Sequence, residues 1–343
     1  MTRRVLAIAL AVSVFSSPLG AQNSKVEINL PTDNDALFHG GGPDFYQYIE
    51  RDFHGEKSTP WEGGRYGFVR NPVSTAQGLI YTRFHEGIDI RCLHRDARGE
   101  PLDEVRAIAD GKVVHANQVA GYSNYGRYIV IEHVWDGSPY YSLYGHLSEI
   151  AVGVGQRVNR GERIARMGYT GEGLNQARAH VHLELNLMFN RNFESWHDRN
   201  FRDPNHNGIY NGINLTGLDI ARFFLEHDKR SDLTVPAFLA EEETFYRVAV
   251  PDSPHFDLRK FYPWMVKNAA ANAKSWEVSF ARSGVPLQIE ARNEPISRPT
   301  LTYVKKSAID CAYLTRGELA GRGDHAHLTE NGVRLMQLLT WPE

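Results

Sequence analysis

The sequence is poor in three features, and each shortage excludes a class of protein. It has only two cysteines, Cys92 and Cys311, too few for a disulfide-rich scaffold or a four-cysteine zinc site. Its 38 basic and 41 acidic residues give a net charge of -3, which offers no electrostatic basis for binding nucleic acid. After the first segment, no apolar stretch approaches the length of a membrane-spanning helix. We therefore expect no nucleic-acid partner and no stable insertion into a membrane.

The first segment has the pattern of an export signal. Arg3 and Arg4 precede a short apolar run, and small residues follow it up to Ala21. The run is too short to span a bilayer as a helix. We predict that residues 1–21 are a signal peptide and that the mature protein is exported, either periplasmic or secreted. Export would permit a disulfide between Cys92 and Cys311, and two buried thiols are the equal alternative.

The rest of the chain divides by composition, and its length of 343 residues suggests about two domains. Residues 22–78 are rich in glycine, proline and asparagine, and we interpret them as a lead-in segment that wraps the next domain. Residues 79–190 contain short β-rich stretches at 112–116, 128–132 and 140–144. Evenly spaced short strands predict a mainly β domain, an antiparallel sheet or sandwich.

The second half of the chain has a mixed character. Residues 191–230 are interpreted as a loop and helix connector, with a helix at 216–227 that has Thr216 as its N-cap. Residues 231–343 are predicted to form a separate α+β region. In it we expect a helix at 261–274, a strand pair at 276–292 and a closing helix at 329–340. A substrate-binding module, a cap over the active site and a partner-docking domain are all open roles for this region.

One predicted strand gathers ionisable side chains on a single face. Between residues 180 and 187, apolar residues alternate with His180, His182, Glu184 and Asn186. A period of two places these four side chains on the same face of a strand. Two imidazoles beside a carboxylate suit a metal ligand with a catalytic neighbour, and Glu184 is a candidate partner that fixes a histidine tautomer. A solvent-facing polar strand is the alternative interpretation.

A second stretch supplies further ligand types. His85 and Asp89 are four residues apart, with Gly87 between them to permit a bend. Zinc accepts imidazole nitrogen and carboxylate oxygen, and catalytic zinc sites keep three protein ligands and one open position. His85, Asp89 and one histidine of the 180–187 strand would complete such a set.

Together with a third stretch, these residues resemble the M23 family of metallopeptidases, of the lysostaphin or LytM type. The family pattern is His-x-Gly-x-Asp, then His-Leu, then His-x-His, and all three parts occur here in that order. An Ala-Asp-Gly strand, a Val-Gly turn and a Gly-x-Thr-Gly loop also match between them. The resemblance covers roughly residues 79–190, about a third of the chain. The matching segments are residues 85–89, 109–114, 146–147, 154–164, 167–171 and 180–182.

The resemblance implies a LytM-like fold and a Zn²⁺ cofactor. It implies that His85, Asp89 and His182 are the zinc ligands and that His146 and His180 are the catalytic histidines, without saying which is the base. It further implies a zinc metalloendopeptidase that hydrolyses peptide bonds of peptidoglycan through a zinc-activated water. The chain departs from the family at an insertion, 95–104, and at 177–179, where the family has Gly-Pro. Both departures concern the shape of the groove rather than the chemistry.

Two other functions compete with this interpretation. Some proteins of this fold lose ligands and activate cell-wall amidases instead of cutting peptides, but the complete five-residue set argues against such a non-catalytic regulator. Residues 154–164 also resemble a strand pair of biotinyl and lipoyl carrier domains. Such carriers need a lysine on a hairpin tip, and no suitable lysine lies between Lys112 and Ile164.

Several further motifs do not support a site. His325 and His327 repeat the His-x-His spacing without an alternating strand, which favours a loop. Residues 203–208 begin like a calcium loop, but Asn214 stands at the twelfth position where a Glu or Asp ligand is expected, so a polar turn is favoured.

Overall fold

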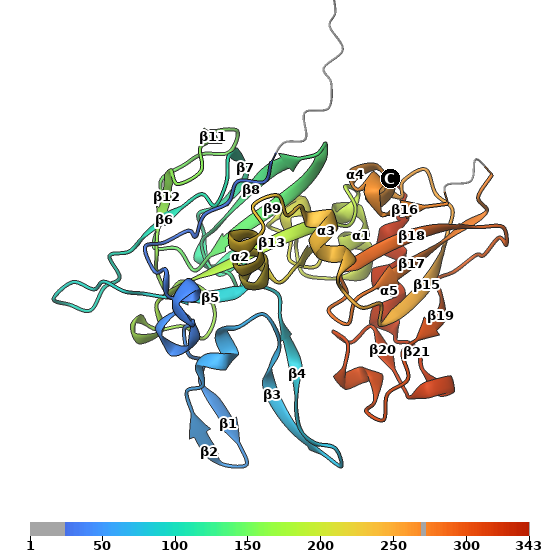
Figure 1. Cartoon of the computed structure of the whole chain (residues 1–343), viewed down its shortest axis with the longest axis horizontal. Coiled ribbons are helices and arrows are strands. Elements are labelled where there is room, and N and C mark those ends of the chain that lie inside the picture. Colours follow the sequence, from blue (N-terminus) through green and yellow to red (C-terminus); the bar gives the residue numbers. More distant parts are fainter. Residues whose placement is uncertain (1–24, 269–271, 343) are drawn as a thin grey trace, which may run out of the picture.

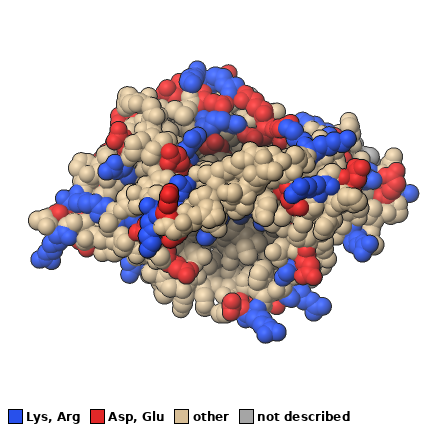
Figure 2. Space-filling model, turned by 90° about the horizontal axis from the view of Figure 1, so that it is seen from below, with Lys and Arg blue, Asp and Glu red and all other residues tan. Residues whose placement is uncertain are grey.

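The computed structural model describes residues 25–268 and 272–342, and strands dominate the fold. Figure 1 shows the main sheet on one side, the C-terminal elements on the other, and two hairpins projecting below. Seen from that lower side, the surface is hollowed near its centre, and charged side chains lie mostly around the hollow (Figure 2). The predicted signal peptide lies outside the described residues. Within the described part of the chain, no helix is long and apolar enough to cross a membrane.

An antiparallel sheet of seven strands forms the first half of the fold. The predicted strands at 112–116, 128–132, 140–144 and 180–187 all belong to it, so the mainly β prediction is confirmed. A smaller sheet packs in the same half, with the order β10 (Glu149–Ile150), β12 (Arg163–Arg166), β6 (Glu104–Arg106). The main sheet has the order β11 (Arg157–Val158), β7 (Gly111–Asn117), β8 (Tyr128–Trp135), β9 (Ser138–Gly145), β13 (His180–Met188), β14 (Leu215–Gly217), and β5 (Ile88–Arg91) also pairs with β13.

The lead-in segment supplies one hairpin, the first strand of a second hairpin and an extra edge beside β5. The hairpins are β1 (Arg51–Phe53) with β2 (Glu56–Ser58), and β3 (Gly67–Thr75) with β4 (Gly78–His85). The Gln47 N–H donates to the carbonyl oxygen of Asp89 at 2.8 Å, and the Arg91 N–H donates to that of Phe45 at 2.9 Å. The short strand β5 is therefore held on one side by β13 and on the other by the lead-in segment.

The C-terminal unit, residues 231–343, is built around a second sheet and confirms the predicted α+β character. Helices α1 (Phe193–Asn200) and α2 (Ile220–Lys229) precede it. The sheet has the order β16 (Val266–Lys267), β18 (Pro286–Arg292), β17 (Ser275–Phe280), β15 (Tyr246–Pro251), β19 (Thr300–Val304). Its remaining elements are α3 (Val235–Ala240), α4 (Asp257–Phe261), β20 (Leu319–Ala320), β21 (His327–Leu328) and α5 (Glu330–Leu339).

A continuous hydrophobic core joins the two halves. At the end of β13, the Met188 N–H donates to the hydroxyl oxygen of Tyr262 at 2.9 Å. The Asn190 side-chain amide, which is fully buried, donates to the carbonyl oxygens of Leu338 at 2.8 Å and His255 at 3.0 Å. The C-terminal unit is thus bonded directly to the end of the strand that carries His180 and His182.

Two of the predicted helices differ from the structure. The helix predicted at 216–227 begins at Ile220, because Thr216 pairs with Leu187 in the sheet and the Asp219 carboxylate caps the helix instead. The helix predicted at 261–274 is wrong: α4 ends at Phe261, and the chain passes through a 3-10 turn into β16. The turn begins at Pro263, and proline disfavours helical backbone at the residue before it. Residues 269–271 of that prediction lie outside the described part of the chain.

Two other predictions for the C-terminal unit are confirmed. The strand pair at 276–292 is β17 and β18, joined by a turn in which Gly284 has φ +82°. The closing helix at 329–340 is α5, and the Thr329 hydroxyl accepts a hydrogen bond from the Gly332 N–H at 3.0 Å as its N-cap.

Candidate metal centre and catalytic site

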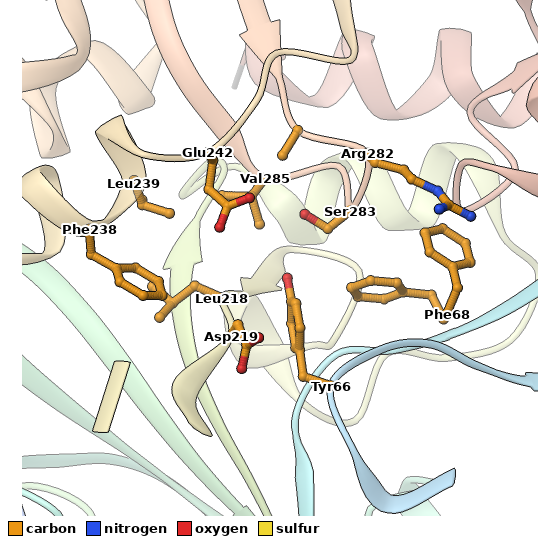
Figure 3. A pocket seen from close by; sticks show the side chains of 12 residues that line it. Tyr66, Phe68, Leu218, Asp219, Phe238, Leu239, Glu242, Arg282, Ser283 and Val285 are labelled. Carbon is orange, nitrogen blue, oxygen red and sulfur yellow. The ribbon is translucent and has the colours of Figure 1, made fainter. Parts of the chain in front are cut away.

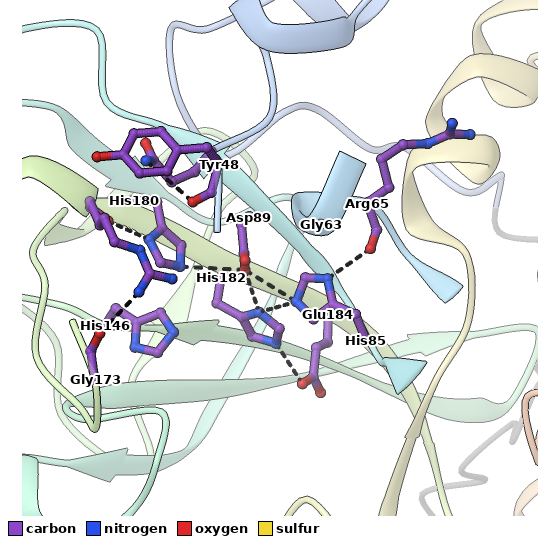
Figure 4. Close-up of polar contacts among 12 residues, drawn as sticks. Tyr48, Gly63, Arg65, His85, Asp89, His146, Gly173, His180, His182 and Glu184 are labelled. Carbon is purple, nitrogen blue, oxygen red and sulfur yellow. Dashed lines mark hydrogen bonds and ion pairs between the residues drawn. The ribbon is translucent and has the colours of Figure 1, made fainter. Parts of the chain in front are cut away.

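The sheet register brings the five predicted site residues together (Figure 4). In the pairing of β5 with β13, Asp89 lies directly opposite His182. His85 ends β4, which leads into β5. On the other side of β13, His182 is paired with Gly145, so that His146 follows immediately after β9. The main sheet therefore positions four of the five side chains, and the β3–β4 hairpin supplies His85.

Three side chains converge on one point. The distance from His182 Nδ1 to Asp89 Oδ1 is 2.9 Å, and from His85 Nε2 to the same oxygen it is 3.2 Å. One ligand atom from each of His85, Asp89 and His182 lies within 4.8 Å of the other two. The three residues are 2–4% exposed. Two nitrogens and one oxygen that converge in a buried place match the donor set of a three-ligand zinc site.

The far nitrogen of each histidine is held by an acceptor. His85 Nδ1 lies 2.8 Å from the carbonyl oxygen of Arg65, which can only accept, so Nδ1 carries the proton. His85 Nε2 then presents its lone pair to the convergence point. His182 Nε2 lies 2.8 Å from the Glu184 carboxylate, which leaves Nδ1 as the ligand atom. Partners of this kind fix the tautomer and ring orientation of metal-binding histidines, and the residues present therefore fit a metal.

Glu184 is itself firmly held. Its side chain is 1% exposed, and it accepts hydrogen bonds from the Tyr125 hydroxyl at 2.8 Å and from the Asn186 side-chain amide at 2.9 Å. The alternation predicted for β13 is present, but the polar face is not solvent-facing, because all nine residues of the strand are buried. The surface-carboxylate alternative for Glu184 is therefore wrong.

His146 and His180 lie beside the three converging residues. Their ring centres are 4.7 Å apart, and His180 Nε2 lies 3.4 Å from Asp89 Oδ1. Each Nδ1 is within hydrogen-bond distance of a backbone carbonyl, that of Thr170 for His146 (2.8 Å) and that of Arg178 for His180 (2.7 Å). Because those carbonyls take the Nδ1 protons, only the Nε2 atoms can accept a proton. His146 has φ +64°, an uncommon backbone conformation outside glycine.

Burial and mutual contact shift the pKa values of the site. Burial and the neighbouring His180 and His182 hold the pKa of His146 well below its usual range, so this ring is neutral near pH 7. Burial works against a charged Asp89, but the nearby His85, His180 and Arg70 hold its pKa well below 3.8. The result is a buried carboxylate that is ionised in the absence of a metal.

His182 behaves in the opposite way. Burial alone would lower its pKa, but hydrogen bonds to Asp89 and Glu184 outweigh burial and raise the pKa to about 10. In the metal-free protein the ring is therefore a cation between two carboxylates. A metal held by His182 would require the Nδ1 proton to leave.

Sequence reasoning missed two features of this site. Arg70 in β3 donates from its guanidinium to Asp89 Oδ2 at 2.6 Å, a contact for which the sequence holds no local signal. The chain bends at Glu86 and Gly87 as expected, but Gly87 does not have a positive φ. A Cβ at Gly87 would overlap the carbonyl oxygen of Leu183, so the missing side chain lets β5 approach β13.

The motifs that were set aside lie away from this centre. Cys92 and Cys311 are both buried free thiols, which decides between the two alternatives for them. His327 begins the short strand β21 and is exposed, and its Nδ1 lies 3.0 Å from the carbonyl oxygen of His325. In the candidate calcium loop, the Asn205 side chain accepts hydrogen bonds from the N–H of Asn207 and the side-chain amide of Asn211, as in a polar turn.

The C-terminal unit packs against the hairpin that carries His85. The guanidinium of Arg282 lies 4.4 Å from the ring centre of Phe68 in β3, and that of Arg316 lies 5.3 Å from the ring centre of Phe84 in β4. Figure 3 shows a small pocket of about 150 Å³ between this hairpin, α3 and the β17–β18 turn. None of the five site residues lines it.

Comparison with known proteins identifies the domain that holds this site. Residues 83–193 match the family model of peptidase family M23. This part of the chain is therefore an M23 peptidase domain, as the sequence resemblance predicted. The three residues that the resemblance implies as metal ligands converge within this domain.

The individual relatives match over short segments. An uncharacterized metalloprotease of Haemophilus influenzae is 37% identical over 38% of this chain and 22% of its own length. The peptidoglycan DD-endopeptidase ShyA of Vibrio cholerae is 45% identical over 18% of this chain and 13% of its own. The murein hydrolase activator EnvC of Escherichia coli is 39% identical over 24% of this chain and 17% of its own. The chain thus spans between 13% and 22% of the length of these relatives.

A solved structure of a zinc-containing peptidase from Vibrio cholerae is also similar. It is 26% identical, with a TM-score of 0.30, and the likeness covers 47% of this chain and 37% of that one. The relatives include both peptidases and an activator of hydrolases, so family membership by itself leaves the choice between catalysis and regulation open.

Proposed function

We propose that this protein is an exported zinc metalloendopeptidase that hydrolyses peptide bonds of peptidoglycan. The observation that carries the proposal is the complete donor set. His85, Asp89 and His182 present their ligand atoms to one point, and His146 and His180 stand beside it with proton-accepting Nε2 atoms. The peptidoglycan substrate is supported by the endopeptidase among the relatives.

The chain's own residues divide the chemistry between them. Zinc bound by these three side chains would polarise a peptide carbonyl and lower the pKa of a water to about 7. His146 is neutral and can accept a proton at Nε2, while its Nδ1 stays fixed on the Thr170 carbonyl. His180, held on the Arg178 carbonyl, can stabilise the developing oxyanion or donate to the leaving amine once it is protonated.

Metal content tests the first half of the proposal. The mature chain, residues 22–343, should contain about one zinc per molecule by elemental analysis, and Asp89→Ala should lose it. His325→Ala is the matched control, because it removes a histidine outside the site and should keep the zinc. Folded wild-type protein that was never exposed to a chelator and contains no zinc would refute the proposal.

Digestion of purified peptidoglycan tests the second half. The zinc-loaded wild type should release soluble peptide-containing fragments, which can be separated by chromatography. His146→Ala should keep its zinc and lose the digestion, because it removes a proton acceptor and no ligand. A wild-type protein that binds zinc but releases nothing would favour the alternative, a non-catalytic LytM-type regulator, which the activator EnvC among the relatives supports. Stimulation of a cell-wall amidase would then be the next measurement.

A further inference from the structure

We propose that the lead-in segment orients ligands of the metal centre and that Arg70 is a positioning residue for Asp89. The inference rests on the proposed function, since it assumes that Asp89 is a zinc ligand. The family match begins at residue 83, and Arg70 lies before it. The inference therefore assigns a role to a part of the chain that the family resemblance leaves without one.

The two oxygens of Asp89 are divided between two tasks. Oδ1 faces His85 and His182 at 3.2 and 2.9 Å, and Oδ2 accepts the hydrogen bond from Arg70 at 2.6 Å. The Arg70 side chain is 23% exposed, and that of Asp89 is 5% exposed, so the bond is shielded from water on the Asp89 side. A charge-assisted bond of this kind fixes the plane of the carboxylate and keeps Oδ2 away from the convergence point.

Arg70 is itself anchored, which lets it act as a fixed reference for Asp89. Its Nε donates to the carbonyl oxygen of Gly63 at 2.8 Å. Gly63 and Gly64 end a 3-10 turn, Trp61–Gly64, that lies tight against the preceding extended chain. A Cβ on Gly63 would overlap the side chain of Ile49, and one on Gly64 would overlap the carbonyl oxygen of Gln47. The absence of side chains at these two positions allows the close approach, which places the Gly63 carbonyl within hydrogen-bond distance of Arg70 Nε.

The lead-in segment also contacts a second proposed ligand, His85, and the strand β5 that carries Asp89. The Arg65 carbonyl, just after the 3-10 turn, holds Nδ1 of His85 at 2.8 Å. The Gln47 N–H donates to the backbone carbonyl of Asp89. Two of the three proposed ligands are therefore oriented by residues 47–70, and His182 is oriented by Glu184 within the domain itself.

The guanidinium has two opposing effects on zinc. Its positive charge opposes a nearby dication, whereas its hydrogen bond fixes the orientation of a ligand. Removal of an outer partner of a metal ligand typically lowers metal affinity by roughly 10–100-fold. The loss of orientation therefore outweighs the relief of charge repulsion. We accordingly expect Arg70 to strengthen zinc binding.

The test compares zinc affinity in variants of the full mature chain, by competition with a chromophoric chelator using zinc alone. Arg70→Met should bind zinc roughly 10–100-fold more weakly than the wild type. Arg70→Lys keeps one charged donor and should fall between the two. Arg83→Met is the matched control, because Arg83 lies opposite Arg70 in the β3–β4 hairpin, is exposed, and should leave affinity unchanged.

Two further readouts separate positioning from a merely structural role. The metal-free Arg70→Met protein should stay folded with a lower melting temperature, because the buried Asp89 loses a charged partner. The visible spectrum of its cobalt-substituted form should change as well. Equal or tighter zinc binding in Arg70→Met would overturn the inference, as would weaker zinc binding with an unchanged cobalt spectrum. If Arg70→Met does not fold, Arg70→Lys decides by the same criteria. A wild type without zinc refutes the proposed function and the inference with it, whereas a zinc-binding wild type with an unaffected variant refutes only the inference.

Discussion

Replacing Glu184 with alanine should weaken zinc binding without removing any ligand. Glu184 is 1% exposed and accepts the hydrogen bond from Nε2 of His182, whose Nδ1 is the proposed ligand atom. In Glu184→Ala the His182 ring loses the partner that fixes its tautomer and orientation. The Tyr125 hydroxyl also loses its acceptor, and the Asn186 amide keeps only the Tyr141 carbonyl. The perturbation therefore acts on both the metal and the fold.

The magnitudes follow from these contacts. Loss of an outer partner of a metal-binding histidine costs roughly 10–100-fold in affinity, or about 1.4–2.7 kcal/mol. Each buried donor left without an acceptor costs the fold about 1–3 kcal/mol. Glu184→Gln keeps the shape and one carbonyl oxygen, so both losses should be smaller. Competition with a chelator measures the affinity, and thermal unfolding of the metal-free protein measures the stability.

A control separates Glu184 from carboxylates in general. Glu172 is exposed, so Glu172→Ala should bind zinc like the wild type. If Glu184→Ala, folded and free of metal at the start, binds zinc as tightly as the wild type, the reasoning is refuted. His182 would then be oriented by the metal and the sheet alone.

Three other results are expected. Gly87→Ala should lower the free energy of unfolding by roughly 1–3 kcal/mol, because its Cβ overlaps the Leu183 carbonyl, and a thermal melt equal to that of the wild type would contradict this. Although burial opposes it, hydrogen bonding raises the pKa of His182 to about 10 in the metal-free fold. The stability that protonated His182 gives the metal-free fold is complete below about pH 6.5 and is lost as the pH rises toward 10. Zinc affinity should rise over the same pH range, because the proton leaves the ligand nitrogen. Calorimetric titration at several pH values can check both trends. Deleting 231–343 should give unfolded or insoluble protein, because the core is continuous across the boundary; a soluble truncated chain with raised peptidase activity would instead indicate a removable cap.

The sequence predicts four neighbouring strands of the main sheet and names five candidate site residues, because both depend on short-range patterns. The period of two around His180 and His182 identifies the strand and its polar face correctly. The same pattern says nothing about exposure, which depends on chain segments that are distant in the sequence. Tyr125, for example, lies far from Glu184 in the chain and contacts it only because the sheet folds that way.

The Arg70 contact and the bounds of two helices could not be predicted, because they depend on strand register and on competing local signals. The contact of Arg70 with Asp89 spans 19 residues and requires a particular pairing of the β3–β4 hairpin. Thr216 and Asp219 are both good helix caps, and pairing of Thr216 with β13 decides between them. At 261–274 the residues favoured a helix, and Pro263 ended it near its first residue.

Strand β13 carries His180 and His182 at its beginning and meets the C-terminal unit at its end. Nine residues in extended conformation span about 30 Å, and the strand pairs with β9 on one side and with β5 and β14 on the other. Beyond it, the buried Asn190 amide binds the carbonyl oxygen of Leu338 at the end of α5. The strand is therefore held at its beginning by β5 and β9 and at its end by the C-terminal unit. A force on the C-terminal unit would reach the proposed ligand His182 through this strand, and a hinge between the two halves would have to break the buried hydrogen bonds of Asn190.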